Sequence, residues 1–261
     1  ISDSFVAKPR FFTEHLAKAR ALRYLHFTVD HTTNDERTAL ANVGSSIVLE
    51  QLEFLSLVFE NLYDEEEGIV GGIFYPAFFD KFEFPNLKGI RLQFTFLQLF
   101  PEANLAFFGK LSQLRNVQYL SVGYDDDDGL ELWEELSIAL PNVTTLDLLF
   151  ELGHDELFQA LSHTREQVPR RAFPNLQEIV VEDGRWEGLG EYLEGATELR
   201  RVVVYADRDG PLQDEDEYTR RARRHDSAKI DLERRFVAKE RYQSFVSCWW
   251  VHHDPWLQDW G

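Results

Sequence analysis

Methionine is missing from the 261 residues, and cysteine occurs once, as Cys248. A single cysteine excludes an internal disulfide bond, which favours a cytoplasmic or nuclear location. No apolar run approaches the roughly 18 residues that cross a membrane, so we expect a soluble globular chain. Glycine-rich phosphate loops and the HExxH and GxSxG motifs are absent as well. The sequence therefore predicts no catalytic residue, no cofactor and no metal ion.

Positive charge is scarce over most of the chain, whose formal net charge is −19. Residues 218–241 carry nine Lys/Arg against four Asp/Glu, a balance of +5, and only Asp254 and Asp259 follow them, which leaves −22 on residues 1–217. An acidic body repels phosphate groups, so nucleic acid and anionic membranes are not expected as partners. A partner with a basic protein surface is expected instead. We interpret the RRARR run at 220–224 as a solvated face that partly neutralises the body, the alternative being a nuclear-localisation or nucleic-acid patch.

One stretch of sequence recurs along the chain. FPNLKGIRLQF at 84–94, LPNVTTLDLLF at 140–150 and FPNLQEIVVED at 173–183 share an apolar residue, Pro, Asn and an aliphatic residue, followed by alternation. The underlying repeat block is an aliphatic residue, two others, a second aliphatic, one other and a third aliphatic. Seven such blocks begin at Leu22, Leu52, Leu87, Val117, Val143, Leu176 and Leu199. They start 23 to 35 residues apart, which indicates a repeat with variable insertions.

Strands and helices should alternate along these repeats. The alternating aliphatics of each block are typical of a strand buried on one face. Between blocks the apolar spacing becomes helical, and we expect amphipathic helices at 10–20, 103–115, 130–140 and 156–168. A strand followed by a helix in each copy predicts parallel strands joined by crossovers. No copy buries its own apolar face, so the copies must stack.

The L-x-x-L-x-L spacing of the seven blocks resembles that of the leucine-rich repeat family. The FPNL and LPNV openings are similar to the divergent repeats of fungal F-box proteins. The resemblance implies an α/β solenoid of about seven repeats with a parallel sheet. It also implies an F-box-like, ubiquitin-pathway role, in which an upstream segment preceding Ile1 would dock a ubiquitin-ligase core. The family usually has Asn or Cys three residues after the third aliphatic, whereas this chain has mostly acidic residues there, which cannot donate a hydrogen bond. Either the ladder of side-chain donors that bridges neighbouring repeats is missing, or the alignment of this chain with the family's repeat fails at the strand ends.

The repeats are expected to end near residue 209. We predict a solenoid over 1–209 and a C-terminal cap over 210–261, with a charged helix at 218–245 followed by a segment that holds four of the six tryptophans. Covering the open end of a solenoid would explain that tryptophan density. The alternative is an enzyme or metal-dependent protein whose site uses Cys248, His252 and His253, although Cys248 is better explained as a structural thiol.

Function is expected on the exposed side of the sheet and along one edge. The residues between the aliphatics mix aromatic, aliphatic and polar groups, as binding surfaces do. Acidic residues gather after the strands, where they would either attract a basic partner or complement helix dipoles. The predicted partner-binding residues are Tyr24, His26, Phe54, Ser56, Arg91, Gln93, Tyr119, Asp147, Glu178 and Arg201 on the face, with Asp125 and Asp126 on the acidic edge. We therefore predict a protein-recognition module, the alternatives being the enzyme above or a self-assembling structural solenoid.

Overall fold

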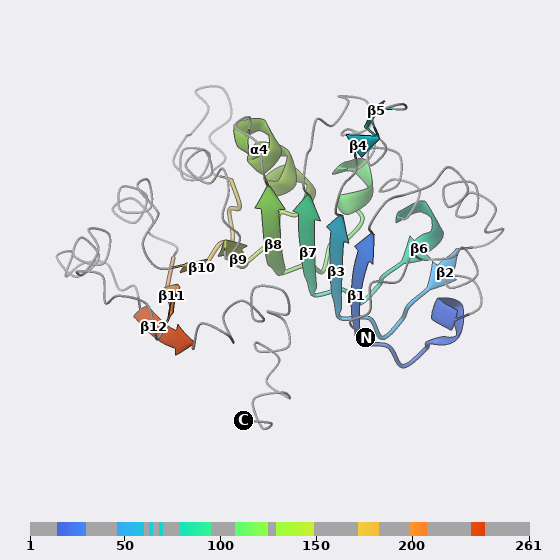
Figure 1. Cartoon of the computed structure of the whole chain (residues 1–261), viewed down its shortest axis with the longest axis horizontal. Coiled ribbons are helices and arrows are strands. Elements are labelled where there is room, and N and C mark those ends of the chain that lie inside the picture. The colour runs from blue at the N-terminus through green and yellow to red at the C-terminus, as the bar shows by residue number, and fades with distance from the viewer. Residues whose placement is uncertain are drawn as a thin grey trace.

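The computed structural model places an eight-stranded sheet at the centre of the molecule (Figure 1). It describes residues 15–29, 46–59, 63–64, 68–69, 79–94, 108–124, 129–148, 172–182, 199–207 and 231–237. The other residues lie outside this description, among them the predicted helix at 156–168, the acidic-edge residues Asp125 and Asp126, and the tryptophan-rich C-terminal segment.

The strands of the main sheet follow one another in sequence order. They are β1 (Tyr24–Val29), β3 (Phe54–Phe59), β7 (Gly89–Phe94), β8 (Tyr119–Tyr124), β9 (Thr145–Leu148), β10 (Glu178–Glu182), β11 (Arg201–Asp207) and β12 (Asp231–Val237). Every neighbouring pair is parallel. Figure 1 shows β1 to β8 side by side and β9 to β12 turning away from them. The predicted α/β class and parallel sheet are confirmed.

Short elements complete the described fold. They are the 3-10 helix η2 (Leu16–Lys18), the parallel pair β2 (Ile47–Val48) and β6 (Phe82–Glu83), the antiparallel pair β4 (Tyr63–Asp64) and β5 (Gly68–Ile69), and the helix α4 (Gly129–Ala139). Helix α4 confirms the helix expected at 130–140. Of the helix expected at 103–115 the described part is helical at 108–111, and of that at 10–20 the described part, 15–20, contains the short helix η2 and ends in a turn.

The aliphatic residues of the repeat blocks form the core. Their second and third positions lie on the inner side of the sheet, and from β3 to β11 all of them are fully buried: Leu55, Leu57, Ile90, Leu92, Leu120, Val122, Leu146, Leu148, Ile179, Val181, Val202 and Val204. Helix α4 contributes Trp133, which is also fully buried and meets the Phe173 ring edge-on at 6.5 Å. Burying such side chains stabilises a fold by about 1.5–3 kcal/mol each, which explains why the repeat spacing specifies the sheet.

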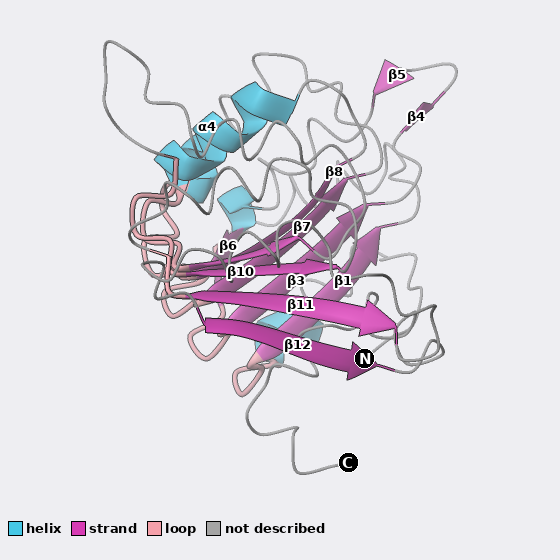
Figure 2. Ribbon diagram, turned by 90° about the vertical axis from the view of Figure 1, so that its left-hand side faces the viewer, coloured by secondary structure: helices cyan, strands magenta, loops and turns pink. Residues whose placement is uncertain are grey.

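An equivalent turn precedes the strands. The amide of Leu87 donates to the carbonyl of Phe84 at 3.2 Å, so Pro85 and Asn86 occupy the two central positions of a four-residue turn. The same bond recurs ahead of β1, β3, β8, β9 and β10. These turns stack along one edge of the sheet, drawn pink in Figure 2. The edge where the strands begin is therefore built from repeated parts.

The C-terminal region differs from the prediction. We expected a helix over 218–245, but residues 231–237 form strand β12, which pairs in parallel with β11 over seven residues, from Arg201 opposite Asp231 to Asp207 opposite Val237. The prediction of a helix is therefore wrong for this part of the segment. The free edge of β11 presents unpaired N–H and C=O groups, and pairing with them outweighs the helical spacing of the apolar residues. The sheet thus has one strand more than the seven blocks predicted.

Candidate functional site

Two neighbouring surfaces of the sheet carry the polar and aromatic side chains outside the core. The first is the face of the sheet opposite the core, where residues from different strands form rows because every strand pair has the same register. The second is the edge at which the strands begin. Each surface is built from equivalent residues of successive repeats, which recur at the strand spacing of about 4.8 Å.

The face has a first row of residues, aligned at the first position of each strand. It consists of Tyr24, Phe54, Gly89, Tyr119, Thr145, Glu178 and Arg201. Its side chains from Tyr24 to Arg201 are partly exposed, apart from the buried Gly89. Five of them, all but Gly89 and Thr145, belong to the predicted partner-binding set. The structure therefore brings those five into one line.

Three rings of this row contact one another, and we call Tyr24, Phe54 and Tyr119 the aromatic row. The rings of Tyr24 and Phe54 stack with centroids 5.4 Å apart and planes 4° from parallel. Phe54 also meets Tyr119 edge-on at 6.5 Å, although β7 lies between their strands. This contact is possible because the intervening residue is Gly89, where a Cβ atom would lie only 2.4 Å from Cδ1 of Phe54.

Polar contacts continue the first row beyond the aromatic residues. Tyr119 donates its hydroxyl hydrogen to a carboxylate oxygen of Asp147. Burial, followed by the negative charge of Asp147, raises the pKa of Tyr119 well above its ordinary value. Farther along the sheet, Arg201 donates to Glu178 at 2.8 Å in a partly exposed ion pair. The row thus changes from aromatic at β1–β8 to charged at β10–β11.

The second row of the face is less exposed than the sequence predicted. It consists of His26, Ser56, Arg91, Ser121, Asp147, Val180 and Val203. All except His26 are buried, with Arg91 only 1% and Asp147 0% exposed. The expectation of an exposed row is therefore wrong for Ser56, Arg91 and Asp147. The second row therefore offers little surface to a partner, apart from His26.

His26 is the least buried member of the second row. Its Nδ1 atom lies 2.8 Å from the hydroxyl oxygen of Ser56, which joins two more of the predicted residues. Burial, followed by the positive charge of Arg91, lowers the pKa of His26 to about 4. His26 is therefore neutral at physiological pH. Gln93 belongs to β7, whereas its side chain is outside the described residues.

The edge where the strands begin carries an asparagine ladder. Each rung is a hydrogen bond from a side-chain amide to the carbonyl two residues before the first aliphatic of the preceding repeat. The bonds run from Asn86 to Glu50, Asn116 to Pro85, Asn142 to Arg115 and Asn175 to Pro141, at 2.7 to 2.9 Å. The resemblance implied a ladder three residues after the third aliphatic, where this chain has mostly acidic residues. The ladder lies instead just before the first aliphatic, where the recurring Pro-Asn pair was its signal.

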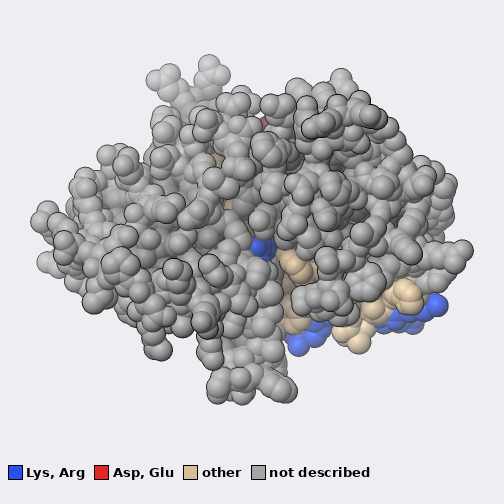
Figure 3. Space-filling view, in the orientation of Figure 1, with Lys and Arg blue, Asp and Glu red and all other residues tan. Residues whose placement is uncertain are grey.

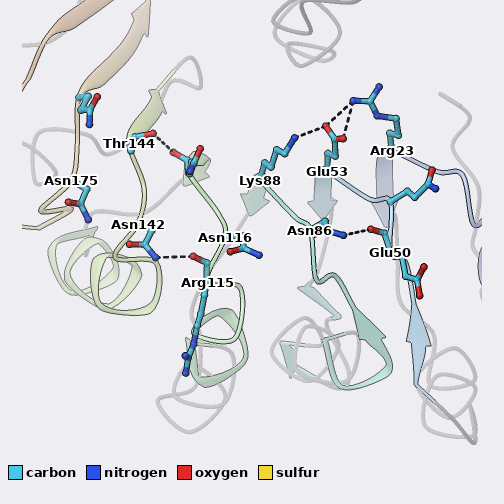
Figure 4. A pocket seen from close by; sticks show the side chains of 13 residues that line it. Arg23, Glu50, Glu53, Asn86, Lys88, Arg115, Asn116, Asn142, Thr144 and Asn175 are labelled. Carbon is cyan, nitrogen blue, oxygen red and sulfur yellow. Dashed lines mark hydrogen bonds and ion pairs between the residues drawn. The ribbon is translucent and has the colours of Figure 1, made fainter.

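A groove of about 860 Å³ runs along this edge (Figure 4), and we call it the amide groove. Its lining is mainly amide and contains no aromatic ring among the described residues. The lining residues are Arg23, Glu50, Gln51, Glu53, Asn86, Lys88, Arg115, Asn116, Gln118, Asn142, Thr144, Asn175 and Gln177. The Pro-Asn pairs of the repeat openings pointed to Asn86, Asn142 and Asn175, and the sequence did not single out the rest of this set.

The charges of the amide groove nearly balance. Three cationic side chains, Arg23, Lys88 and Arg115, face two carboxylates, Glu50 and Glu53. Glu53 pairs with Arg23 at 3.0 Å and with Lys88 at 3.3 Å, from either side in Figure 4. The pKa of Glu53 is lowered, chiefly by the hydrogen bond that its carboxylate accepts from Arg23. In the view of Figure 3, Lys and Arg side chains are visible among uncharged residues along the lower edge, in a chain whose net charge is −19.

The described residues include no group of three or more His, Cys, Asp or Glu side chains placed to hold a metal ion. No helix in the described ranges is long and apolar enough to cross a membrane. Comparison of the chain with protein-family models, curated proteins and solved structures gave no match. The geometry above is therefore the basis for any functional proposal.

Proposed function

We propose that the chain is a leucine-rich-repeat-type solenoid that recognises another protein through the first row of its sheet. The observation that carries this proposal is the aromatic row, in which three partly exposed rings contact one another across four strands. The recurring turns, the common strand register and the asparagine ladder support the solenoid. Such stacking leaves the first row of the sheet partly exposed, where a partner can reach it.

The chemistry of the first row suits a protein partner. Aromatic residues and arginine dominate the residues that contribute most to binding energy at protein interfaces. Here Tyr24, Phe54 and Tyr119 hold one another in place, so little side-chain entropy remains to be lost on binding. The Glu178–Arg201 pair at the other end adds charged groups that fix a partner's orientation.

The similarity to fungal F-box proteins extends the proposal. In that case a segment upstream of Ile1 would dock a ubiquitin-ligase core, and the first row would select the protein to be modified. The acidic residues predicted after the strands, including Asp125 and Asp126, would favour a partner with a basic surface. The site of action would be the cytoplasm or the nucleus.

Affinity capture with matched variants tests this proposal. The intact chain is compared with the triple variant Tyr24→Ala, Phe54→Ala, Tyr119→Ala and with Ile138→Ala, which removes an exposed apolar side chain on α4. Because one aromatic anchor contributes about 2 kcal/mol, we expect the triple variant to bind a captured partner at least roughly 30-fold more weakly. Circular dichroism checks that every variant folds. If each specific partner stays bound to the folded triple variant, the first row is not the binding surface.

A further inference from the structure

The amide groove has a chemistry that the aromatic row lacks. Its ladder asparagines are exposed, and each rung uses one of the two hydrogens on the amide nitrogen. The second hydrogen and the Oδ1 oxygen of each amide therefore remain on the solvent side. Gln51, Gln118 and Gln177 add three more exposed amides beside them. The groove thus offers donors and acceptors together, at regular intervals.

A peptide backbone needs that combination. Each residue of an extended chain presents one C=O acceptor and, unless it is proline, one N–H donor, and a polyproline II segment makes no internal hydrogen bonds. A neutral amide side chain can bond to either group. Charged ligands fit less well, because three cations and two carboxylates nearly cancel in the groove. Sugars fit less well too, since no aromatic ring is among the described lining residues to stack on a pyranose ring.

The spacing of the groove matches a polyproline II helix. Such a helix rises about 3.1 Å per residue, so one three-residue turn advances about 9.3 Å. Two strand spacings of a parallel sheet advance about 9.4 to 9.8 Å. Every second amide, for example Asn86 and Asn142, therefore meets an equivalent group of such a ligand. The lining extends from the start of β1 to the start of β10, which is five strand spacings or about 24 Å. That length holds about eight residues.

We propose that the amide groove binds an extended, proline-containing polypeptide segment of about eight residues, lying across the starts of the strands. The ladder amides and the Gln118 and Gln177 side chains bond to its backbone carbonyl and amide groups. Backbone recognition of this kind tolerates many side chains and depends on the conformation of the ligand. The site is separate from the aromatic row, and its occupation does not require Tyr24, Phe54 or Tyr119.

Side-chain amide signals in 15N NMR spectra test this proposal directly. The probe is the blocked nonapeptide (Pro-Pro-Gln)3, and (Gly-Gly-Gln)3 is the flexible control peptide. We expect the proline peptide to shift the Asn and Gln side-chain signals of the groove and to bind at least about five-fold more tightly than the glycine peptide, because its backbone is already extended. Equal binding of both peptides, or no shift with either, overturns the proposal.

Protein variants locate the binding. Gln118→Ala with Gln177→Ala removes two hydrogen-bonding groups but leaves the ladder in place, and Gln113→Ala removes an exposed amide outside the groove. We expect the first variant to lose at least about five-fold in affinity, corresponding to about 1 kcal/mol, and the second to bind normally. Unchanged affinity of the first variant refutes the site. Binding of cellohexaose in place of the peptide refutes the ligand class.

A further variant separates this site from the proposed function. The triple alanine variant of the aromatic row should bind the proline peptide as the intact chain does. Loss of peptide binding in that variant assigns the peptide to the aromatic row and overturns the groove proposal. If the triple variant binds the peptide normally and still captures protein partners, only the proposed role of the aromatic row is overturned.

Discussion

Gly89→Ala is expected to disrupt the ring contacts of the aromatic row. A Cβ atom at this position would lie 2.4 Å from Cδ1 and 2.6 Å from Cε1 of Phe54, and 3.2 Å from Cδ1 of Tyr119. Carbon atoms do not approach to 2.6 Å, so the Phe54 ring must swing away. That movement removes its stacking on Tyr24 at 5.4 Å and its edge contact with Tyr119 at 6.5 Å.

Two opposing effects set the size of the loss. Each ring contact contributes about 0.5–1.5 kcal/mol, so losing both costs about 1–3 kcal/mol. Alanine also restricts the unfolded chain, which returns about 0.4–1 kcal/mol. We therefore expect Gly89→Ala to lower the free energy of unfolding by about 1–2 kcal/mol. Gly109→Ala is the matched control, since nothing lies within 4 Å of its added Cβ atom and residue 109 is helical. That change should stabilise by up to about 1 kcal/mol.

Urea unfolding of Gly89→Ala, of Phe54→Ala and of the variant that carries both changes provides the measurement. In a Phe54→Ala background the clashing ring is gone, and only Tyr119 remains close to residue 89, at a distance that a small shift relieves. Gly89→Ala should then be neutral or slightly stabilising, which gives a coupling energy of about 1–2 kcal/mol. An equal cost of Gly89→Ala in both backgrounds would show that contact with Phe54 is not the reason for glycine at this position.

Two further predictions concern the ladder and the second row. Asn116→Asp keeps the shape of the side chain but removes the hydrogen donated to the Pro85 carbonyl, so the free energy of unfolding should fall by about 1 kcal/mol. Gln113→Glu adds the same charge at an exposed position, and an equal loss there would attribute the effect to charge. The folded-state pKa of His26, about 4, lies below its ordinary value of 6.5, so between these pH values the unfolded chain binds a proton that the folded protein does not. The contribution of His26 to the free energy of unfolding is then fully present above pH 6.5 and falls as the pH is lowered towards 4. His26→Gln should reduce the dependence of this free energy on pH, measured by urea unfolding, and an unchanged dependence would contradict the prediction.

The strands were the part of the fold that could be predicted best. The aliphatics of all seven blocks gave strands at the expected places and on the expected face, because alternation with period two fixes which side of a sheet each residue occupies. Parallel pairing followed from the repeat length, since the long connections exclude hairpins. The helix at 130–140 was predicted for the same local reason, the burial of Trp133 and Leu136 on one stripe.

Predictions failed where a segment's environment decided its structure. Residues 231–237 have apolar residues at helical intervals, but the free edge of β11 made them a strand. Arg91 and Asp147 alternate with core aliphatics as exposed residues do, yet both are buried. The ladder was expected after the strands but lies before them, although Asn86, Asn116, Asn142 and Asn175 occupy one position in their repeats. Sequence spacing identified that position without revealing which carbonyl lies within reach.

The sequence by itself determined the repeat, the strands, their parallel order and the residues that face outward together. These features depend on interactions within one repeat or on a periodicity shared by all, so they are visible in one dimension. Only the tertiary structure decided which outward residues touch. Phe54 reaches Tyr119 over Gly89, Tyr119 bonds to Asp147, and each ladder asparagine meets a carbonyl of the preceding repeat. Such contacts join residues of different repeats, at least 28 positions apart in the sequence, and their distances are set by strand spacing and register, which form only when the repeats stack.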